Sequence, residues 1–218
     1  ALSGTGERGI FNLEAAQSKA PTRRYAPLIQ GTNPCGEIML RDMELCNLSE
    51  VVIRAEDDLD TLLDKVETAT WLGLIQSTFT DFPYLREEWK KNCDVERLLG
   101  VSLTGQMDNP AVMNFEALKA LKSRVLRISR KASSLLGVNM PAATTCVKPS
   151  GTVSQLVDSA SGVHPRWSDY YIRRYRIAAR DPLFKMLKKQ GFPCKPENGQ
   201  KPKKATTWVL SFPVKAPE

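Results

Sequence analysis

The sequence contains little of what a metal site or a disulfide scaffold needs. It has a single histidine, His164, and its five cysteines occur in no Cys-x-x-Cys spacing. An odd number of such cysteines argues against a disulfide framework, and their spacing argues against a zinc ribbon. We therefore expect no metal ligands, and we expect reduced thiols, which are typical of cytoplasmic proteins. The cysteines are Cys35, Cys46, Cys93, Cys146 and Cys194.

Long apolar runs are also missing. No stretch approaches the roughly 20 apolar residues that a membrane-spanning helix requires, and the chain does not open with a signal peptide. We therefore expect no membrane partner and a cytoplasmic location. The first residue is Ala1 rather than methionine, and the last residues follow a strand-like run, so we expect a piece of a longer protein.

What is present is the composition of a globular protein with an excess of positive charge. Hydrophobic residues make up 42% of the chain and charged residues 25%, which is enough to bury a core. The net charge of +7 indicates an anionic partner, which is a nucleotide, a nucleic acid or only the counterions of the solvent.

The hydrophobic pattern indicates long helices that alternate with short strands. From Leu59 to Ile75, apolar residues recur at helical spacing behind a run of aspartates. Asn114 and Gly137 are suited to cap the helix between them, and Asp181 with the following proline begins another helix. We expect helices over residues 59–75, 87–99, 115–136 and 182–190, strands over 51–53, 101–103, 144–147 and 207–212, and a surface loop over 191–204. This alternation predicts an α/β fold with parallel strands.

The stretch GTNPCGEIML, residues 31–40, places three polar side chains on alternate positions of what reads as a strand end. In an extended chain Asn33, Cys35 and Glu37 would point at one spot. A neighbouring carboxylate disfavours a thiolate, so a neutral thiol that loses a hydrogen atom suits the site better than an ionised nucleophile. Glu37 would then act as a general base on a substrate hydroxyl that Asn33 holds. The alternative is a structural turn, which the pattern alone favours.

A second cysteine follows eleven residues later, in LCNLSEVVI. Cys46 is close enough in sequence to Cys35 for the two to meet on neighbouring extended segments. Free cysteines are also among the most frequently buried small residues. Without further support, a buried structural cysteine is the better interpretation.

The stretch CVKPSGTVSQL, residues 146–156, has the composition of an anion site. A strand leads into a loop in which Gly151 allows close approach of a ligand, while Ser150, Thr152 and Ser154 supply hydroxyl groups. A following helix would direct free N–H groups outward. An ordinary turn before a helix N-cap explains the same residues equally well.

Arginines alternate with aromatic residues in GVHPRWSDYYIRRYRIAAR, residues 162–180. Such a segment can bind single-stranded nucleic acid by stacking and by phosphate contacts. Tyr171, Ile172 and Tyr175 also fit a packed face with arginine side chains around it. We favour packing.

Taken in order, these stretches resemble the large catalytic subunit of ribonucleotide reductase. NPCGEI is similar to the finger loop of that family, LCNLSE to a segment with one of two reducing cysteines, and KPSGTVS to the substrate-phosphate loop. GVHPRWSDYYIRR, GERGIFN and GVSLTGQMD match in character and order. The resemblance covers nearly the whole chain. The short interval from Cys35 to Cys46 and the segment SGTVSQLVDSASGVHPR are most similar to the corresponding features of the adenosylcobalamin-dependent class II enzymes.

The resemblance implies a role for each matching residue in reducing ribonucleotides to deoxyribonucleotides for DNA replication. Cys35 would be the thiyl radical that takes the 3′ hydrogen, Glu37 would accept the 3′-hydroxyl proton, and Asn33 would bind the ribose hydroxyls. Cys46 would be one of two thiols that are oxidised as the 2′-hydroxyl leaves as water. The substrate phosphates would lie on Pro149, Ser150, Gly151, Thr152, Val153 and Ser154.

The resemblance also implies a fold and partners. The family fold is a ten-stranded α/β barrel with the finger loop through its centre, and residues 1–218 would form one partial catalytic barrel domain, roughly its second half. The implied cofactor is adenosylcobalamin, the substrate a ribonucleoside di- or triphosphate, and the reductant a dithiol such as thioredoxin; nucleic acid is not an expected partner.

Other parts of the family pattern are absent from the sequence. These are the first barrel half, the C-terminal redox cysteines, and a cysteine before Asn33 that would pair with Cys46. The cysteines at positions 93, 146 and 194 sit in the wrong places for that pairing. We expect the isolated chain to be inactive and poorly soluble.

Two interpretations from other classes stay open. One is a nucleic-acid-binding module built on residues 162–180, which binding of a single-stranded oligonucleotide that weakens steeply with salt would support. The other is a glycyl-radical or other nucleotide enzyme, whose C-terminal motif lies outside these residues.

Overall fold

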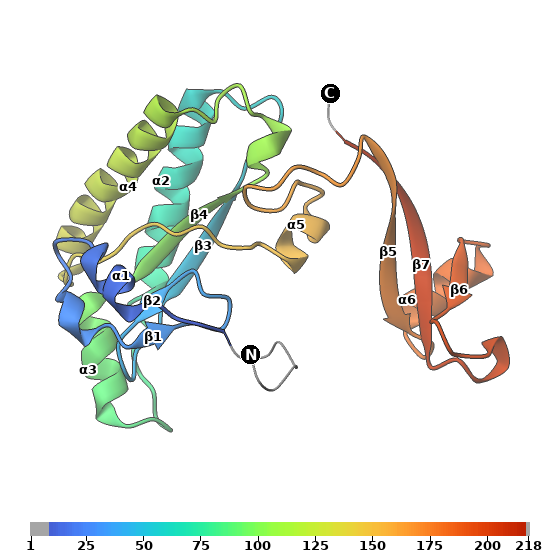
Figure 1. Ribbon diagram of the computed structural model, residues 1–218, viewed down its shortest axis with the longest axis horizontal. Coiled ribbons are helices and arrows are strands. Elements are labelled where there is room, and N and C mark those ends of the chain that lie inside the picture. Colours follow the sequence, from blue (N-terminus) through green and yellow to red (C-terminus); the bar gives the residue numbers. More distant parts are fainter. Residues whose placement is uncertain (1–8, 217–218) are drawn as a thin grey trace. The chain divides into compact units, whose positions relative to one another are not determined.

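The computed structural model describes residues 9–216, which fall into two compact units, Ala1–Pro165 and Arg166–Glu218 (Figure 1). The prediction of one partial barrel domain over residues 1–218 stays a prediction. The first three residues of the GERGIFN stretch lie outside the described residues. No helix among the described residues is long and apolar enough to cross a membrane.

The first unit contains helices, short strands and two 3₁₀ turns. In chain order they are α1 (Leu13–Ser18), η1 (Ala26–Leu28), β1 (Gly31–Thr32), β2 (Met39–Leu40), β3 (Asn47–Val52), α2 (Leu59–Gln76), α3 (Glu87–Glu96), β4 (Leu99–Thr104), η2 (Gln106–Asp108), α4 (Phe115–Leu136) and α5 (Thr152–Leu156).

Strands β3 and β4 form the parallel pair at the centre of the first unit. Their register runs from Asn47 opposite Leu99 to Val52 opposite Thr104. On the other side of β4, Val101 forms a single parallel bridge with Thr145, which is all that remains of the expected strand over residues 144–147. This parallel arrangement with long connecting helices confirms the predicted α/β class.

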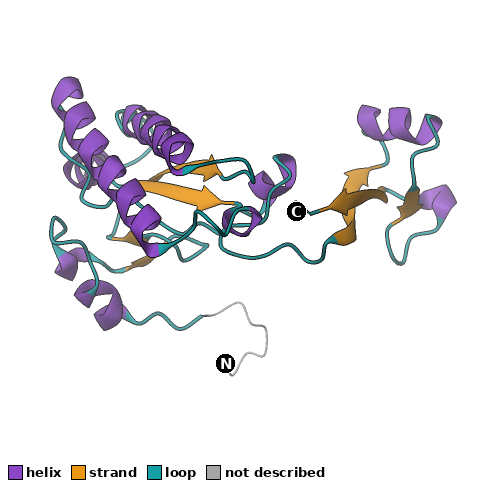
Figure 2. Ribbon diagram, turned by 90° about the horizontal axis from the view of Figure 1, so that it is seen from above, coloured by secondary structure: helices purple, strands orange, loops and turns teal. Residues whose placement is uncertain are grey.

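Helices α2 and α4 cover one face of the β3–β4 pair, as Figures 1 and 2 show. Their contact with the strands is a buried apolar cluster, and burial of such side chains stabilises each by about 1.5–3 kcal/mol. The cluster consists of Val51, Ile53, Leu62, Val66, Ala69, Val101, Leu121 and Val125. The hairpin that carries Cys35 lies on the opposite face of the β3–β4 pair.

The helix ends follow the capping residues read from the sequence. The side chain of Asn114 accepts a hydrogen bond from the N–H of Ala117, and Gly137 ends α4 in the left-handed region. The expected helix over residues 87–99 is shorter, because Arg97 adopts φ 45° and ends α3 at Glu96. Leu99 therefore begins β4 instead of ending a helix.

The second unit is an antiparallel sheet with one helix against it. It consists of β5 (Tyr170–Ala178), α6 (Pro182–Lys189), β6 (Cys194–Pro196), η3 (Pro202–Lys204) and β7 (Thr207–Lys215). The strand order is β5-β7-β6, so the parallel pairing expected from the sequence does not extend to this unit. The expected surface loop over residues 191–204 contains β6 and η3.

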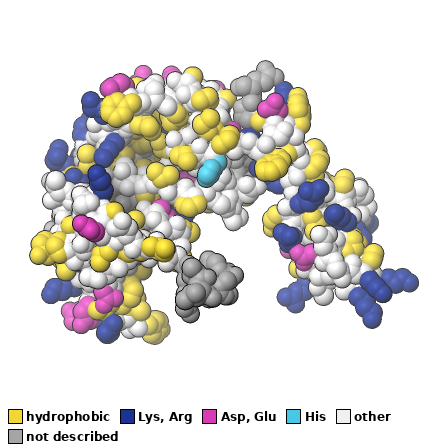
Figure 3. Space-filling model, in the orientation of Figure 1, with side chains coloured by type: hydrophobic (Ala, Val, Ile, Leu, Met, Phe, Trp, Pro, Cys, Tyr) yellow, Lys and Arg dark blue, Asp and Glu magenta, His cyan; other side chains and the backbone are white. Residues whose placement is uncertain are grey.

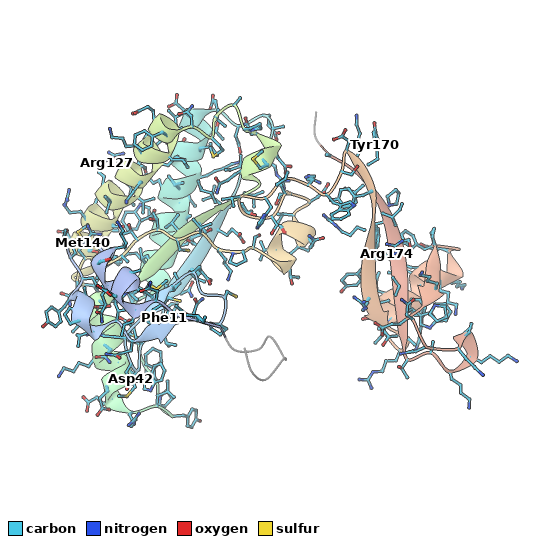
Figure 4. The ribbon with its side chains drawn as sticks, in the orientation of Figure 1. Phe11, Asp42, Arg127, Met140, Tyr170 and Arg174 are labelled. Atoms are coloured by element: carbon cyan, nitrogen blue, oxygen red, sulfur yellow. The ribbon has the colours of Figure 1, made fainter. Side chains whose placement is uncertain are left out.

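The segment of alternating arginines and aromatics forms β5, and its aromatic side chains are largely exposed. Tyr175 is 55% and Ile172 50% exposed, so the favoured packed face is wrong for these two residues. A nine-residue strand directs alternate side chains to opposite faces, and of this strand only Ile177 is buried. Figure 4 labels Tyr170 and Arg174, which both lie on this strand.

The positive charge of the chain is concentrated in the second unit. Residues 166–218 contain 13 Lys and Arg against 4 Asp and Glu, a net charge of +9, whereas residues 1–165 contain 18 against 20. The space-filling view in Figure 3 accordingly shows many dark blue Lys and Arg side chains on the second unit. The net charge of the whole chain therefore says little about the surroundings of Cys35.

Candidate active site

The loop with Cys35 is the tip of a two-stranded hairpin. Gly31 and Thr32 of β1 pair antiparallel with Leu40 and Met39 of β2. Between them the N–H of Gly36 donates to the carbonyl of Asn33 at 3.0 Å, and Gly36 adopts φ 81°, which suits glycine. Residues 33–38 are therefore a tight loop, and the expected extended strand end is wrong.

The polar side chains of the tight loop differ in their exposure to solvent. The side-chain oxygen of Asn33 accepts from the N–H of Ile38 at 3.0 Å, which closes the loop. Cys35 is exposed at the tip, whereas the side chain of Glu37 is only 2% exposed. The three residues share one tight loop, in which the Asn33 side chain also interacts with Glu37 and Cys35 lies at the exposed tip.

Glu37 is held by a lysine from a distant part of the chain. The ammonium of Lys148 lies 3.2 Å from Oε1 of Glu37, while Oε2 is buried without a hydrogen-bond partner among the described residues. Burial raises the pKa of Glu37, but the N–H of its own backbone, the Asn33 side chain and the Lys148 ammonium outweigh burial. The pKa of Glu37 therefore lies below its ordinary value, and this carboxyl is ionised at neutral pH.

Two thiols lie on the sheet face beneath this carboxylate. Cys46 and Cys146 pack against a buried cluster of Ile38, Leu98 and Ala142. Burial, followed by the charge of Glu37, raises the pKa of Cys46, and the same two causes raise the pKa of Cys146 to about 12. Both thiols are therefore protonated at neutral pH, and both can donate hydrogen.

From the sequence, Cys146 was judged to lie in the wrong place to pair with Cys46. The structure places Cys146 on the same side of the sheet as Cys46. The two are nevertheless not placed for a direct disulfide. Cys46 precedes β3, and Cys146 follows Thr145, which bridges to the far side of β4. Two strand spacings amount to roughly 10 Å, and a disulfide needs Cα atoms within about 7 Å. The partner of Cys46 is therefore not supplied by Cys146 in this arrangement.

Gly100 makes room for this cluster. A Cβ at position 100 would lie 2.4 Å from Cδ2 of Leu48, 2.9 Å from Sγ of Cys146 and 3.2 Å from Cδ1 of Ile38. A side chain at the centre of the sheet face would thus collide with β3, with the 143–146 segment and with the hairpin at once. Because position 100 of β4 carries no side chain, these three segments can pack together.

The loop over residues 149–154 follows directly from Lys148. Ser150 adopts φ 61° and is 5% exposed, and its hydroxyl has no hydrogen-bond partner among the described residues. Ser154 is fully buried and donates to the carbonyl of Gly151 at 2.8 Å, so its hydroxyl shapes the loop. Gly151, Thr152 and Val153 are exposed at the start of α5.

Sequence reasoning missed the residues that join these parts. Lys148 has no motif role of its own in the sequence, and its contact with Glu37 spans 111 residues. Arg24, which binds Glu44, Glu96 and the carbonyl of Met39, was not singled out. An isolated arginine outside a motif carries no signal that its side chain is buried. Within the described residues, no group of three His, Cys, Asp or Glu side chains is placed to hold a metal ion.

Comparison with known proteins was made against family models, curated sequences and solved structures. No family model matches the chain. The adenosylcobalamin-dependent ribonucleoside-triphosphate reductase of Lacticaseibacillus paracasei is 30% identical over 252 residues, which cover 99% of this chain and 33% of the relative. The reductase of the same name from Levilactobacillus brevis is 31% identical over 97% of this chain and 32% of its own length.

A solved structure agrees with these relatives. The crystal structure of a B12-dependent (class II) ribonucleotide reductase matches 99% of this chain with a TM-score of 0.76 and 27% identity. The chain is a homologue of the class II ribonucleotide reductases. It spans about one third of the length of these relatives, since the match covers 34% of the solved chain.

A more distant reductase shares the fold alone. The alpha subunit of the class Id ribonucleotide reductase of Actinobacillus ureae matches 86% of this chain with a TM-score of 0.53 and 19% identity. None of the proteins named here is a nucleic-acid-binding module, so the comparisons give that alternative no support.

Proposed function

We propose that the native polypeptide with these residues reduces ribonucleotides to 2′-deoxyribonucleotides by a thiyl-radical reaction, as an oxidoreductase of class II. The observation that carries this proposal is the buried carboxylate of Glu37 in the Cys35 loop, whose Oε2 has no hydrogen-bond partner among the described residues. The named relatives, ribonucleoside-triphosphate reductases at about 30% identity, support the same reaction.

Residues of this chain supply the radical, the general base and one of the two reducing thiols. The Cys35 thiyl takes the 3′ hydrogen atom of the substrate, forming an S–H bond and leaving a carbon radical. Glu37 accepts the 3′-hydroxyl proton at Oε2, and the Asn33 amide binds the ribose hydroxyls. The 2′-hydroxyl then leaves as water with a proton from a thiol. Cys46 and a second thiol supply the two electrons, and one of their hydrogens replaces the lost hydroxyl at the 2′ carbon, so that the two sulfurs become a disulfide. Glu37 then returns its proton to the 3′ oxygen, and Cys35 returns its hydrogen atom to the 3′ carbon, which regenerates the thiyl.

Burial of the two thiols suits this chemistry. A raised pKa keeps Cys46 protonated at neutral pH, so it is available as a donor of hydrogen and not as a thiolate. The ionised Glu37 is the opposite case, because a general base must begin without its proton. One carboxylate thus both accepts a proton and holds the nearby thiols in their neutral form.

When bound, adenosylcobalamin would supply the radical chemistry that converts a cysteine thiol of the protein into a thiyl. Cys35 fits that requirement, because its thiol is exposed at the loop tip and is accessible from outside the hairpin. Cys35 is then the residue that the cofactor side of the site has to face. The protein groups that bind the cofactor are not assigned to residues of this chain.

The substrate is a ribonucleoside di- or triphosphate whose phosphates lie on residues 149–154. The exposed backbone at Gly151 to Val153 and the unpartnered hydroxyl of Ser150 support this placement. The names of the relatives favour a triphosphate. A dithiol protein of the thioredoxin type would restore the disulfide after each turnover, and the product would supply DNA replication in the cytoplasm.

The test is turnover by the native polypeptide with a ribonucleoside triphosphate, adenosylcobalamin and a dithiol. We expect deoxynucleotide product from the wild type, none from Cys35→Ala, and wild-type rates from Cys194→Ala as the matched cysteine control. Full turnover by Cys35→Ala would disprove the proposal. Glu37→Gln should lower kcat more than it changes KM, because the base acts in the chemical step.

A further inference from the structure

Lys148 is the cation that contacts Glu37, and its backbone is fixed on both sides. Its N–H donates to Oγ of Ser102 at 3.0 Å, and Ser102 is fully buried on β4. Its carbonyl oxygen lies so close to Gly162 that a Cβ there would approach it to 3.1 Å. The side chain therefore extends from an anchored backbone toward the carboxylate.

The lysine meets the two carboxylate oxygens of Glu37 unequally. Oε1 is 3.2 Å from the ammonium, and Oε2 is buried without a partner. A buried carboxylate oxygen without a hydrogen-bond partner lowers the stability of the folded state. A native structure that retains such an oxygen indicates that a ligand binds there. A substrate hydroxyl is the group that would fill this position under the proposed function.

We propose that Lys148 is a positioning residue of this site: its ammonium holds Oε1 of Glu37 and leaves Oε2 as the proton acceptor for the substrate hydroxyl. This inference rests on the proposed function and deepens it. Because Pro149 and Ser150 follow Lys148 directly, the same residue joins the carboxylate to the loop assigned to the substrate phosphates. Binding of phosphate at the loop and the position of the base are thereby mechanically linked.

The charged and titratable groups around Lys148 support a steering role. Burial alone would lower the pKa of Lys148, but its hydrogen bond to Glu37 and the charges of Glu37 and Glu50 raise it. Oε1 of Glu50 is itself buried without a hydrogen-bond partner among the described residues. Removing the ammonium would leave the buried carboxylate of Glu37 without its cation, which favours protonation of Glu37. The thiols of Cys46 and Cys146 face the same carboxylate.

The first test follows the titration of Glu37 itself and needs no catalysis. The carboxyl carbon of Glu37 is observed by NMR in the native polypeptide labelled with ¹³C-glutamate across the pH range, in wild type, Lys148→Met, Lys148→Arg and Lys122→Met. Lys122 is an exposed lysine of α4 and serves as the matched control. We expect Lys148→Met to move the titration of Glu37 to higher pH, Lys148→Arg to restore it in large part, and the control to leave it unchanged. An unmoved titration in Lys148→Met overturns the proposal.

The second test is the pH profile of kcat in the native polypeptide. We expect Lys148→Met to move the acid limb of kcat to higher pH, with roughly a tenfold loss of kcat at low pH that lessens as pH rises. If Lys148 served only to bind substrate phosphate, KM would rise with kcat and its acid limb unchanged, and that result also overturns the proposal. An inactive wild type would instead refute the proposed function, while the NMR titration still decides whether Lys148 controls Glu37.

Discussion

Arg24 and Glu44 form an ion pair of 2.9 Å in which both side chains are buried, at 3% and 0% exposed. The same guanidinium binds Glu96 at the end of α3 at 2.8 Å and donates to the carbonyl of Met39 in β2. One arginine thus attaches the hairpin with Cys35 to the end of α3, just before β4. The position of the Cys35 loop depends on this buried network.

The first prediction concerns Arg24→Met. Removal of one partner from a buried ion pair leaves uncompensated charge and costs about 3–5 kcal/mol. We expect a loss of unfolding free energy in that range, measured by urea denaturation of the 218-residue chain. Arg130→Met, at an exposed arginine of α4, should change it by less than about 0.5 kcal/mol. Equal stability of the two variants would show that Arg24 does not anchor the hairpin.

The second prediction concerns the pH dependence of stability at Glu44. Burial and then the neighbouring Glu96 raise the pKa of Glu44 to about 8, from an ordinary 4.5. A carboxyl with a raised pKa binds its proton more tightly in the folded state, so its contribution is complete below pH 4.5 and is lost as pH rises toward 8. We expect Glu44→Gln to remove this decline, so that the difference in unfolding free energy between wild type and variant changes across this window. A constant difference from pH 4.5 to 8 would contradict the shift.

Glu37 contributes with the opposite sign. Its pKa is lowered, so its stabilising contribution is present above its ordinary pKa and disappears as pH falls through the folded value. The two carboxyls therefore act in different pH windows, and Glu44→Gln and Glu37→Gln can be compared in one series of denaturation curves.

The third prediction concerns Gly100→Ala. A methyl group at this position would overlap Leu48 and Cys146 and press on Ile38 of the hairpin. Such overpacking costs about 1–3 kcal/mol, which denaturant unfolding can measure. Gly73→Ala in α2 is the matched control, because its Cβ would lie 3.5 Å from Leu99, an ordinary contact. We expect the control to be neutral or slightly stabilising, and a neutral Gly100→Ala would disprove close contact across β4.

The fourth prediction concerns thiol reactivity. At neutral pH we expect iodoacetamide to label the exposed Cys35 before Cys46 and Cys146, because burial and the charge of Glu37 raise the pKa of both buried thiols. Peptide mass spectrometry over a time course gives the order directly. Glu37→Gln removes the charge and should speed labelling of these two cysteines relative to wild type. Rates that Glu37→Gln leaves unchanged would show that the carboxylate does not face them.

The sequence predicts local structure well where the signal is local. Helix α4 has the predicted bounds, because Asn114 and Gly137 define its ends through short-range capping. In the second unit the sequence predicts α6 and most of β7 but not β5, whose arginines and aromatics indicated only a packed face or a nucleic-acid-binding segment. Pairing with β7, a distant partner, decides its strand conformation.

The candidate site shows the same division. The motif around Cys35 identifies the loop, but the extended backbone that the alternation assumed is wrong, since Gly36 adopts a left-handed φ of 81°. The contact of Glu37 with Lys148 and the approach of Cys146 to Gly100 join residues that are far apart in the sequence. Packing of the hairpin onto the sheet creates these contacts, and no short pattern encodes them.

Removal of the 3′ hydrogen of a ribonucleotide is the step that tests the radical reaction most directly. The measurement is a competition between substrate with hydrogen and substrate with deuterium at the 3′ carbon, using the native polypeptide and its Glu37→Gln variant, in which the chemical step is slowed. We expect the substrate with hydrogen to be consumed faster, most clearly in the variant, and no consumption of either by Cys35→Ala. Equal consumption of both substrates in wild type and in the slowed variant would contradict hydrogen abstraction by Cys35.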